Sequence, residues 1–423
     1  MEKVEIKIRT KNLKYKKKSK IIYIIILSLI SLYILKQNYM INLKNRNNLF
    51  NSLNNNITKI IENVNNSLFI DYIKACKALK IFNNRVKIKN KYPFLSICIC
   101  VYNSEKYIKN AVLSIINQSF QDFEIIIIND FSKDNTYDII MKLKKEDNRI
   151  IIINHKKNYG TYYSRTEGAL NSRGKYILFV DPDDLIINPY LFEALYYYYN
   201  NFNLDIIEFT VYHQIEEKNL IYYPQEHKHN HYHNFSNKII YQPDLSDIIF
   251  YQPRTKNYST VICRTIWNKL YKREVMLKTI NYIGNDYYKN KYIIVVEDTL
   301  LNVINFHFAE NYTNINIPGY LYNIRQFSIT RLKTTKEYFI KKSISFFLYY
   351  QLLFRYIKEF NKDRNFFFYE FQFFGDELIK LKKYNITNYS QNASIMFKEI
   401  MNDNKSSSEL KKYIKEYYKL FSF

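Results

Sequence analysis

Short apolar runs alternate with amphipathic stretches along the chain from Pro93 onward. The four clearest runs are rich in β-branched residues and comprise Leu95–Val101, Glu124–Ile128, Arg149–Ile153 and Tyr176–Val180. Runs of this kind are typical of strands that are buried on both faces. The intervening stretches Ser104–Gln118 and Thr136–Glu146 have the pattern of crossover helices. The alternation therefore predicts an α/β fold with a mostly parallel sheet flanked by helices.

A different pattern precedes this region, because residues 21–35 (IIYIIILSLISLYIL) are apolar and uncharged. As a helix they span roughly 22 Å, and Lys20 and Lys36 can reach the headgroups on either side of a thin bilayer. A cleaved signal peptide needs a small-residue site after the apolar run, which KQNYM does not offer. A buried core helix does not suit the lysine flanks. We therefore expect a transmembrane helix.

Basic residues are distributed unevenly around this segment. Nine Lys and Arg lie in residues 1–20, and Lys36, Lys44 and Arg46 follow the segment closely. The positive-inside rule then leaves the N-terminus in the cytosol. We expect a single-pass, type II signal anchor that places the body of the chain in the lumen of the Golgi or ER.

Composition divides the chain into five predicted parts. They are a basic tail (1–20), the membrane segment (21–35), an Asn- and Lys-rich stem (36–92), the α/β domain (93–335) and a helical C-terminal region (336–423). Aromatic and lysine-rich helical patterns dominate the last part. They suit either a helical cap on the α/β domain or a helix that lies on the membrane surface.

The net charge of +24 raises the question of a nucleic-acid partner. Part of that charge belongs to the basic tail, and the chain carries no zinc finger, RNP-like motif or repeat array. We therefore expect no nucleic-acid partner. The four cysteines form no CxxC pair, which excludes a zinc ribbon and a disulfide-stapled small fold.

Polar residues follow each predicted strand, at the edge where ligands bind in parallel sheets. Tyr102-Asn103, Asn129-Asp130 and Asp181-Pro182-Asp183-Asp184 stand at three of these ends. Three acidic residues within four positions suit a hard divalent cation that bridges to phosphates. The alternative is an acidic surface turn that opens a helix.

The order of these pieces resembles the family 2 glycosyltransferases of the GT-A fold. The similar segments are LSICICVYN, EIIIINDFSKDNT, NYGTYYSRTEG and GKYILFVDPDD, followed by WNKLYKR, VEDTL and YLYNIRQFSIT. Together they cover residues 93–335. The resemblance implies a GT-A fold and a nucleotide-sugar donor, with UDP-sugar as the expected one.

The resemblance also implies roles for individual residues. The implied nucleotide-sugar site comprises Tyr102, Asn103, Glu105, Asp130, Arg165, Asp181, Pro182 and Asp183. Asp130 would accept the N3–H of the base, and Arg165 would lie near the base and diphosphate. Asp181 and Asp183 match the DxD motif that holds Mn²⁺ or Mg²⁺ on the sugar diphosphate. Asp298, with Glu297 beside it, matches the catalytic carboxylate that acts as general base.

Three departures from the family pattern bear on this site. Phe131 stands where the family has a Gly, so we expect a loop that does not adopt a Gly conformation there. Asn129 replaces the first Asp of a pair, and Thr166-Glu167 replaces the Asn and its neighbour after Arg165. His227, His229, His231 and His233 alternate in a polar insertion that suits a solvated loop better than a metal site.

These residues suit an inverting, metal-dependent transfer of a sugar to a hydroxyl of a glycan, a glycolipid or a glycoprotein. A cation offsets the charge on the leaving diphosphate, and a carboxylate accepts the proton of the acceptor. The alternative is a catalytically inactive sugar-nucleotide-binding or scaffold protein on the same fold. A nucleotidyltransferase would need a Gly- and Arg-rich loop after the first strand, and a processive synthase would need QxxRW and several membrane spans.

Overall fold

A computed structural model describes residues 92–216, 220–222, 239–242, 265–284, 293, 295–325, 336–362 and 387–421. The predicted membrane segment, nearly all of the stem and the histidine-rich insertion lie outside these residues. Within the described part of the chain, no helix is long and apolar enough to cross a membrane.

The first half of the sheet is parallel and follows the predicted alternation. Its strands are β1 (Leu95–Val101), β2 (Phe123–Asn129), β3 (Ile150–Asn154) and β4 (Tyr176–Phe179), in the spatial order β3-β2-β1-β4. The crossover helices are α4 (Ile108–Ile116), α5 (Thr136–Glu146) and α6 (Thr161–Leu170). Every residue of β2 is buried, because helices cover both faces of the sheet. The four predicted strands and the helix at Thr136–Glu146 are confirmed.

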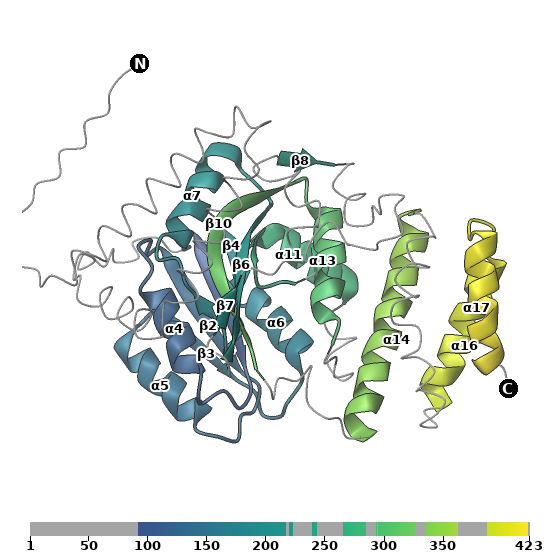
Figure 1. The fold of residues 1–423 in the computed structure, drawn as a ribbon, viewed down its shortest axis with the longest axis horizontal. Helices are drawn as coiled ribbons and strands as arrows, with labels where there is room; N and C mark the ends of the chain where they lie inside the picture. The colour runs from purple at the N-terminus through teal and green to yellow at the C-terminus, as the bar shows by residue number, and fades with distance from the viewer. Residues whose placement is uncertain are drawn as a thin grey trace, which may run out of the picture. The chain divides into compact units, whose positions relative to one another are not determined.

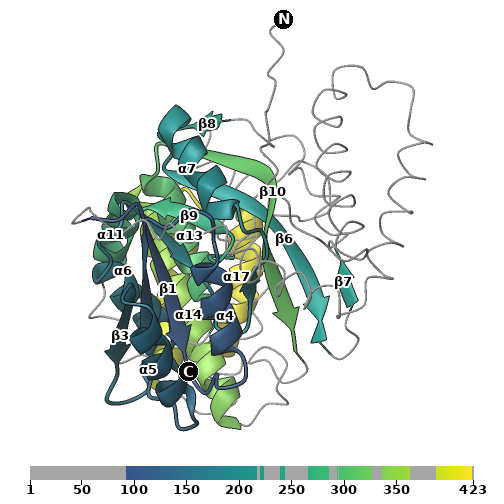
Figure 2. The same cartoon turned by 90° about the vertical axis from the view of Figure 1, so that its left-hand side faces the viewer.

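The second half of the sheet is mixed, so the prediction of a mostly parallel sheet is wrong for the sheet as a whole. Its strands are β5 (Leu185–Ile186), β6 (Ile206–Ile215), β7 (Leu220–Tyr222), β8 (Ile239–Tyr241), β9 (Lys269–Lys272) and β10 (Asn311–Ile324). β9 runs antiparallel to β4 and β6, whereas the long strands β6 and β10 are parallel to each other and lie side by side (Figure 2). An isolated apolar run does not encode strand direction, which depends on the connection that precedes it.

Helices cover the two faces of the sheet in separate groups (Figure 1). α4, α5 and α7 (Leu191–Phe202) share one hydrophobic cluster with one face, while α6, α11 (Arg273–Ile283) and α13 (Glu297–Phe308) share the other. Gly168 and Gly174 serve this packing, since a Cβ atom would lie 2.8 Å from Ile128 Cδ1 at the first and 2.6 Å from Ser96 N at the second.

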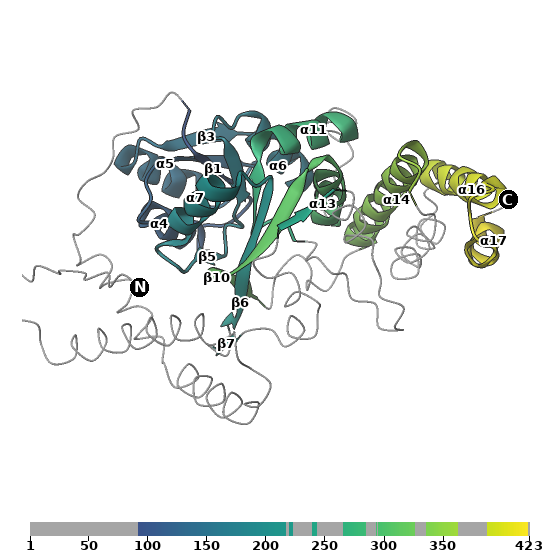
Figure 3. The same ribbon diagram turned by 90° about the horizontal axis from the view of Figure 1, so that it is seen from above.

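The described residues of the C-terminal region are helical, as predicted. They form α14 (Lys336–Glu359), α16 (Thr387–Asn402) and α17 (Ser408–Phe421), and Figure 3 shows these helices from above. Phe346, Tyr349 and Leu353 of α14 are buried in the same cluster as α13. These contacts are what a helical cap on the α/β domain requires, because the apolar side of α14 packs against protein.

Candidate active site

Asp130 lies directly after β2 and is 4% exposed. Its Oδ1 accepts the N–H of Tyr159 at 2.8 Å and lies 2.7 Å from His155 Nδ1, while its Oδ2 accepts the N–H of Gly160 at 2.8 Å. Gly160 begins the turn into α6 at φ 90°, a conformation that favours glycine. Asp130 is therefore held rigidly at the N-terminal end of α6.

His155 links Asp130 to a second carboxylate. Its Nε2 contacts a carboxylate oxygen of Glu167 on α6, and the residue is buried, with 6% exposure. Burial opposes the charged imidazolium, but the hydrogen bonds to Asp130 and Glu167 outweigh it and raise the pKa of His155. The ring is thus a cation between two carboxylates at mildly acidic pH.

The loops after β1 and β2 are cross-linked through Asn103 and Glu105. The Asn103 N–H donates to Ser132 Oγ at 3.0 Å, and its Oδ1 accepts the N–H of Lys133 at 2.8 Å. Glu105 Oε2 accepts two hydrogen bonds at 3.0 Å from Asn135. Both predicted nucleotide-binding residues therefore shape the loops, while Tyr102 beside them is 47% exposed.

The expectation for Phe131 is wrong. Its φ of 66° puts it in the left-handed conformation that a Gly would adopt, although it carries a large side chain. A non-glycine residue in this region costs about 1–2 kcal/mol. The turn after Asp130 therefore has the conformation that suits a Gly, and the Phe131 backbone is strained in it.

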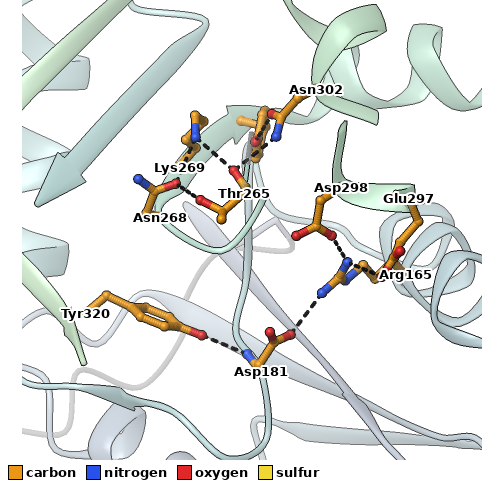
Figure 4. Close-up of polar contacts among 10 residues, drawn as sticks. Arg165, Asp181, Thr265, Asn268, Lys269, Glu297, Asp298, Asn302 and Tyr320 are labelled. Carbon is orange, nitrogen blue, oxygen red and sulfur yellow. Dashed lines mark hydrogen bonds and ion pairs between the residues drawn. The ribbon is translucent and has the colours of Figure 1, made fainter. Parts of the chain in front are cut away.

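Arg165 gathers three carboxylates from distant parts of the chain (Figure 4). Its guanidinium, 4% exposed on α6, donates to Asp181 Oδ1 at 3.0 Å, to Glu297 Oε1 at 3.1 Å and to Asp298 Oδ1. Asp181 follows β4, and the other two open α13, where the helix dipole favours negative charge. One cation thus faces three carboxylates.

The electrostatics of this cluster follow from burial and charge excess. Burial and the neighbouring Asp298 raise the pKa of Glu297 to about 7, although Arg165 opposes the shift. Burial also raises the pKa of Asp298, again against Arg165. The cluster therefore holds negative charge with difficulty and favours the arrival of a proton or a cation.

The aspartates of the DPDD turn make two kinds of contact, hydrogen bonds to Tyr320 and an ion pair with Arg325. Asp184 is fully buried, and its Oδ2 accepts a hydrogen bond from the Tyr320 hydroxyl at 2.8 Å. The same hydroxyl accepts the N–H of Asp181 at 3.0 Å. Asp183 pairs with Arg325 at the end of β10. Burial and Asp181 raise the pKa of Asp183 to about 6. Pro182 stands between the two predicted metal ligands.

A buried polar network supports the first turn of α13. Lys269 Nζ, on β9, donates to Thr265 O and to Asn268 Oδ1, each at 2.8 Å. Asn302, on α13, donates to the same Thr265 carbonyl at 3.0 Å (Figure 4). The Ile266 N–H next in the chain bonds Asp298. The network thus fixes the loop that contacts Asp298.

The structure brings Arg165, Asp181, Glu297 and Asp298 together, and it places Asp130 after β2, which β1 separates from β4 in the sheet. Among the described residues, no group of three or more His, Cys, Asp or Glu has the arrangement of a complete metal site. The sequence signature of Glycosyl transferase family 2 matches residues 96–276. Residues 96–276 are a glycosyl transferase family 2 domain.

Curated relatives agree with this assignment. Over 245 residues the chain is 27% identical to "Glycosyltransferase GlyA" of Streptococcus pneumoniae. This match covers 57% of this chain and 32% of that protein. It is also 27% identical over 240 residues to "Uncharacterized glycosyltransferase EpsJ" of Bacillus subtilis, covering 57% of this chain and 64% of the relative. The chain thus spans less than two thirds of the length of these relatives. A crystal structure of S. aureus TarS 1-349 in complex with UDP-GlcNAc covers 62% of this chain and 72% of its own, at 18% identity and a TM-score of 0.43.

Sequence reasoning missed three residues that contact the carboxylates of the site. His155 lies inside the family 2 domain, while Tyr320 and Arg325 lie beyond residue 276 on or beside β10. His155 directly follows β3, and polar residues at a strand end are the signal that identified Asp130 and Asp181. Arg325 belongs to the segment YLYNIRQFSIT, but no local pattern shows that its partner is Asp183.

Proposed function

We propose that this chain is an inverting glycosyltransferase that moves a sugar from a nucleotide-diphosphate sugar to an acceptor hydroxyl. The observation that supports the proposal most is the convergence of Asp181, from the DPDD turn, with Asp298, from α13, on Arg165. A residue suited to the donor diphosphate and a residue suited to the acceptor proton thus share one cation. UDP-sugar is the donor that the family resemblance favours.

Asp181 and Asp183 are the residues that would hold Mn²⁺ or Mg²⁺. Carboxylate oxygens are the ligands that these hard cations prefer. The two carboxylates suit that role as part of a ligand set, because burial and the neighbouring Asp181 raise the pKa of Asp183 and a divalent ion would offset the charge of both. When bound, the cation supplies charge neutralisation for the leaving diphosphate.

In the transfer that we propose, Asp298 accepts the proton of the acceptor hydroxyl. The acceptor oxygen bonds to the anomeric carbon as the bond from that carbon to the diphosphate oxygen breaks, and the nucleoside diphosphate leaves with the electron pair. One displacement inverts the anomeric configuration. Burial raises the pKa of Asp298, which makes it a stronger base than an exposed aspartate.

The acceptor and the location are parts of the same proposal. The acceptor is a hydroxyl of a glycan, a lipid-linked sugar or a protein. Residues 21–35 anchor the chain in the membrane, with the transferase domain in the lumen of the ER or Golgi. Protease protection in sealed microsomes tests this orientation, because a lumenal domain survives and a cytosolic one is degraded.

The activity is tested with a panel of nucleotide sugars, with Mn²⁺ and with EDTA, by following slow donor hydrolysis by NMR. We expect one donor to be hydrolysed only with metal and to release a sugar of inverted configuration. A sugar that retains the donor configuration contradicts the single displacement. Donor binding without hydrolysis or transfer to any acceptor would instead identify a scaffold protein.

A further inference from the structure

Two exposed aromatic side chains stand on the loops beside Asp130. Tyr102 follows β1 and is 47% exposed, and Phe131 follows β2 and is 37% exposed. The Asn103 N–H donates to Ser132 Oγ and the Lys133 N–H donates to Asn103 Oδ1, and these hydrogen bonds join the two loops. The aromatic residues therefore belong to one cross-linked surface at the carboxyl ends of two adjacent parallel strands.

Phe131 is unusual because neither its backbone nor its packing accounts for it. Its φ of 66° is unfavourable for a large side chain, whereas Asn occupies three of the other four non-glycine positions with positive φ in the described residues. Phe131 also lies outside both hydrophobic clusters of the described residues. A strained residue that adds nothing to the core points to a function for its side chain.

The surroundings of Phe131 indicate what that side chain contacts. Lys133 Nζ lies 3.3 Å from the centroid of the Phe131 ring, so a cation covers part of the ring. The adjoining Asp130 carboxylate is fixed by two backbone N–H groups and His155. An exposed aromatic ring on the residue that directly follows a fixed hydrogen-bond acceptor is suited to a planar heterocycle that carries an N–H donor.

We infer that Phe131 is a binding residue that packs against the nucleobase of the donor. The inference deepens the proposed function and rests on it, because it assumes that the ligand beside Asp130 is a nucleotide. Stacking of a base on an aromatic side chain favours binding whichever base is present. Phe131 thus adds affinity for the nucleoside half of the donor and none for the diphosphate.

The test compares two probes on the full-length protein purified in detergent. UDP carries a base, whereas inorganic pyrophosphate has only the phosphates, and each is titrated with Mn²⁺ by calorimetry. Phe131→Asn keeps a residue that tolerates positive φ and removes the ring, whereas Phe131→Tyr keeps the ring. Tyr197→Asn, which removes an exposed aromatic from α7, is the matched control.

We expect Phe131→Asn to weaken UDP binding about tenfold. Pyrophosphate binding stays at the wild-type value, and the thermal midpoint does not fall, because the strain is relieved. Phe131→Tyr and Tyr197→Asn retain the wild-type affinity for both probes.

Two results overturn the inference while leaving the proposed function intact. One is unchanged UDP binding in Phe131→Asn. The other is an equal loss for UDP and pyrophosphate, which would mean that the loop has been disrupted. Failure of the proposed function looks different, because the wild-type protein itself then binds neither UDP nor GDP nor ADP, and the inference falls with it.

Discussion

The two carboxylate regions of the site are built in opposite ways. Asp130 receives two backbone N–H groups and His155, so its charge is well compensated by neighbours. Around Arg165, three carboxylates share one guanidinium. The charge of the first region is already balanced, so this region is suited to a neutral, planar ligand group. The second region has negative charge in excess and is suited to receive a cation.

The two regions share α6 but differ in how far apart along the chain their other elements lie. Asp130 depends on β2 and the start of α6, which are close in the parallel half of the sheet. The Arg165 cluster joins α6, the end of β4 and the start of α13, which are far apart along the chain. Val296, just before α13, has φ 60°, a strained conformation for a β-branched residue, and it begins the turn that carries Glu297 and Asp298.

The largest effect should come from Asp298→Asn, which removes the proposed base. We expect transfer to slow about 10²–10⁴-fold, with donor binding nearly unchanged, as measured by initial rates and calorimetry. Glu297→Gln is the matched control, because it neutralises the adjacent carboxylate of the same cluster and should slow transfer much less. Equal losses in the two variants would contradict the assignment.

Removal of the Arg165 guanidinium, which the three carboxylates share, should have the next largest effect. Arg165→Met leaves Asp181, Glu297 and Asp298 facing one another, which should lower the free energy of unfolding by about 3–5 kcal/mol. The loss should grow with pH, because the repulsion requires ionised carboxylates. Urea denaturation at pH 5.5 and 8.5 measures both values. Lys341→Met breaks the exposed pair with Glu337, which solvent screens, and should leave the free energy of unfolding nearly unchanged.

Tyr320→Phe should have a smaller effect on stability and a selective effect on binding. It leaves buried Asp184 without one hydrogen-bond donor, at a cost of about 1–3 kcal/mol. Tyr312→Phe removes a comparable hydroxyl from buried Glu208 and should cost a similar amount. Only Tyr320→Phe should weaken Mn²⁺-dependent UDP binding in calorimetry. Equal weakening by both variants would mean that Tyr320 does not position Asp181.

The smallest effect concerns His155 and pH. Its raised pKa means that its stabilising charge is fully present below the ordinary value of about 6.5 and is lost as the pH rises through the raised value. His155→Gln should therefore cost about 1 kcal/mol more at pH 5.5 than at pH 9. Urea denaturation at the two pH values gives the difference, and a cost independent of pH would show that His155 is not charged in the folded protein.

The sequence was informative where local pattern decides structure. The apolar runs located β1 to β4, and strand ends identified Asp130 and Asp181. The resemblance identified Arg165 and Asp298, but the ion pair between them depends on where the first turn of α13 lies in the folded chain, which no local pattern contains. Strand direction in the second half of the sheet, the pairing of Asp183 with Arg325 and the positive φ of Phe131 likewise depend on tertiary contacts.

The most direct test of the contrast between the two regions is UDP binding with and without Mn²⁺ to wild-type, Asp130→Asn and Asp181→Asn proteins. We expect Mn²⁺ to strengthen binding to the wild type. Asp130→Asn should weaken binding in both conditions and keep the Mn²⁺ enhancement, while Asp181→Asn should abolish the enhancement. Mn²⁺ enhancement that survives Asp181→Asn would contradict the account.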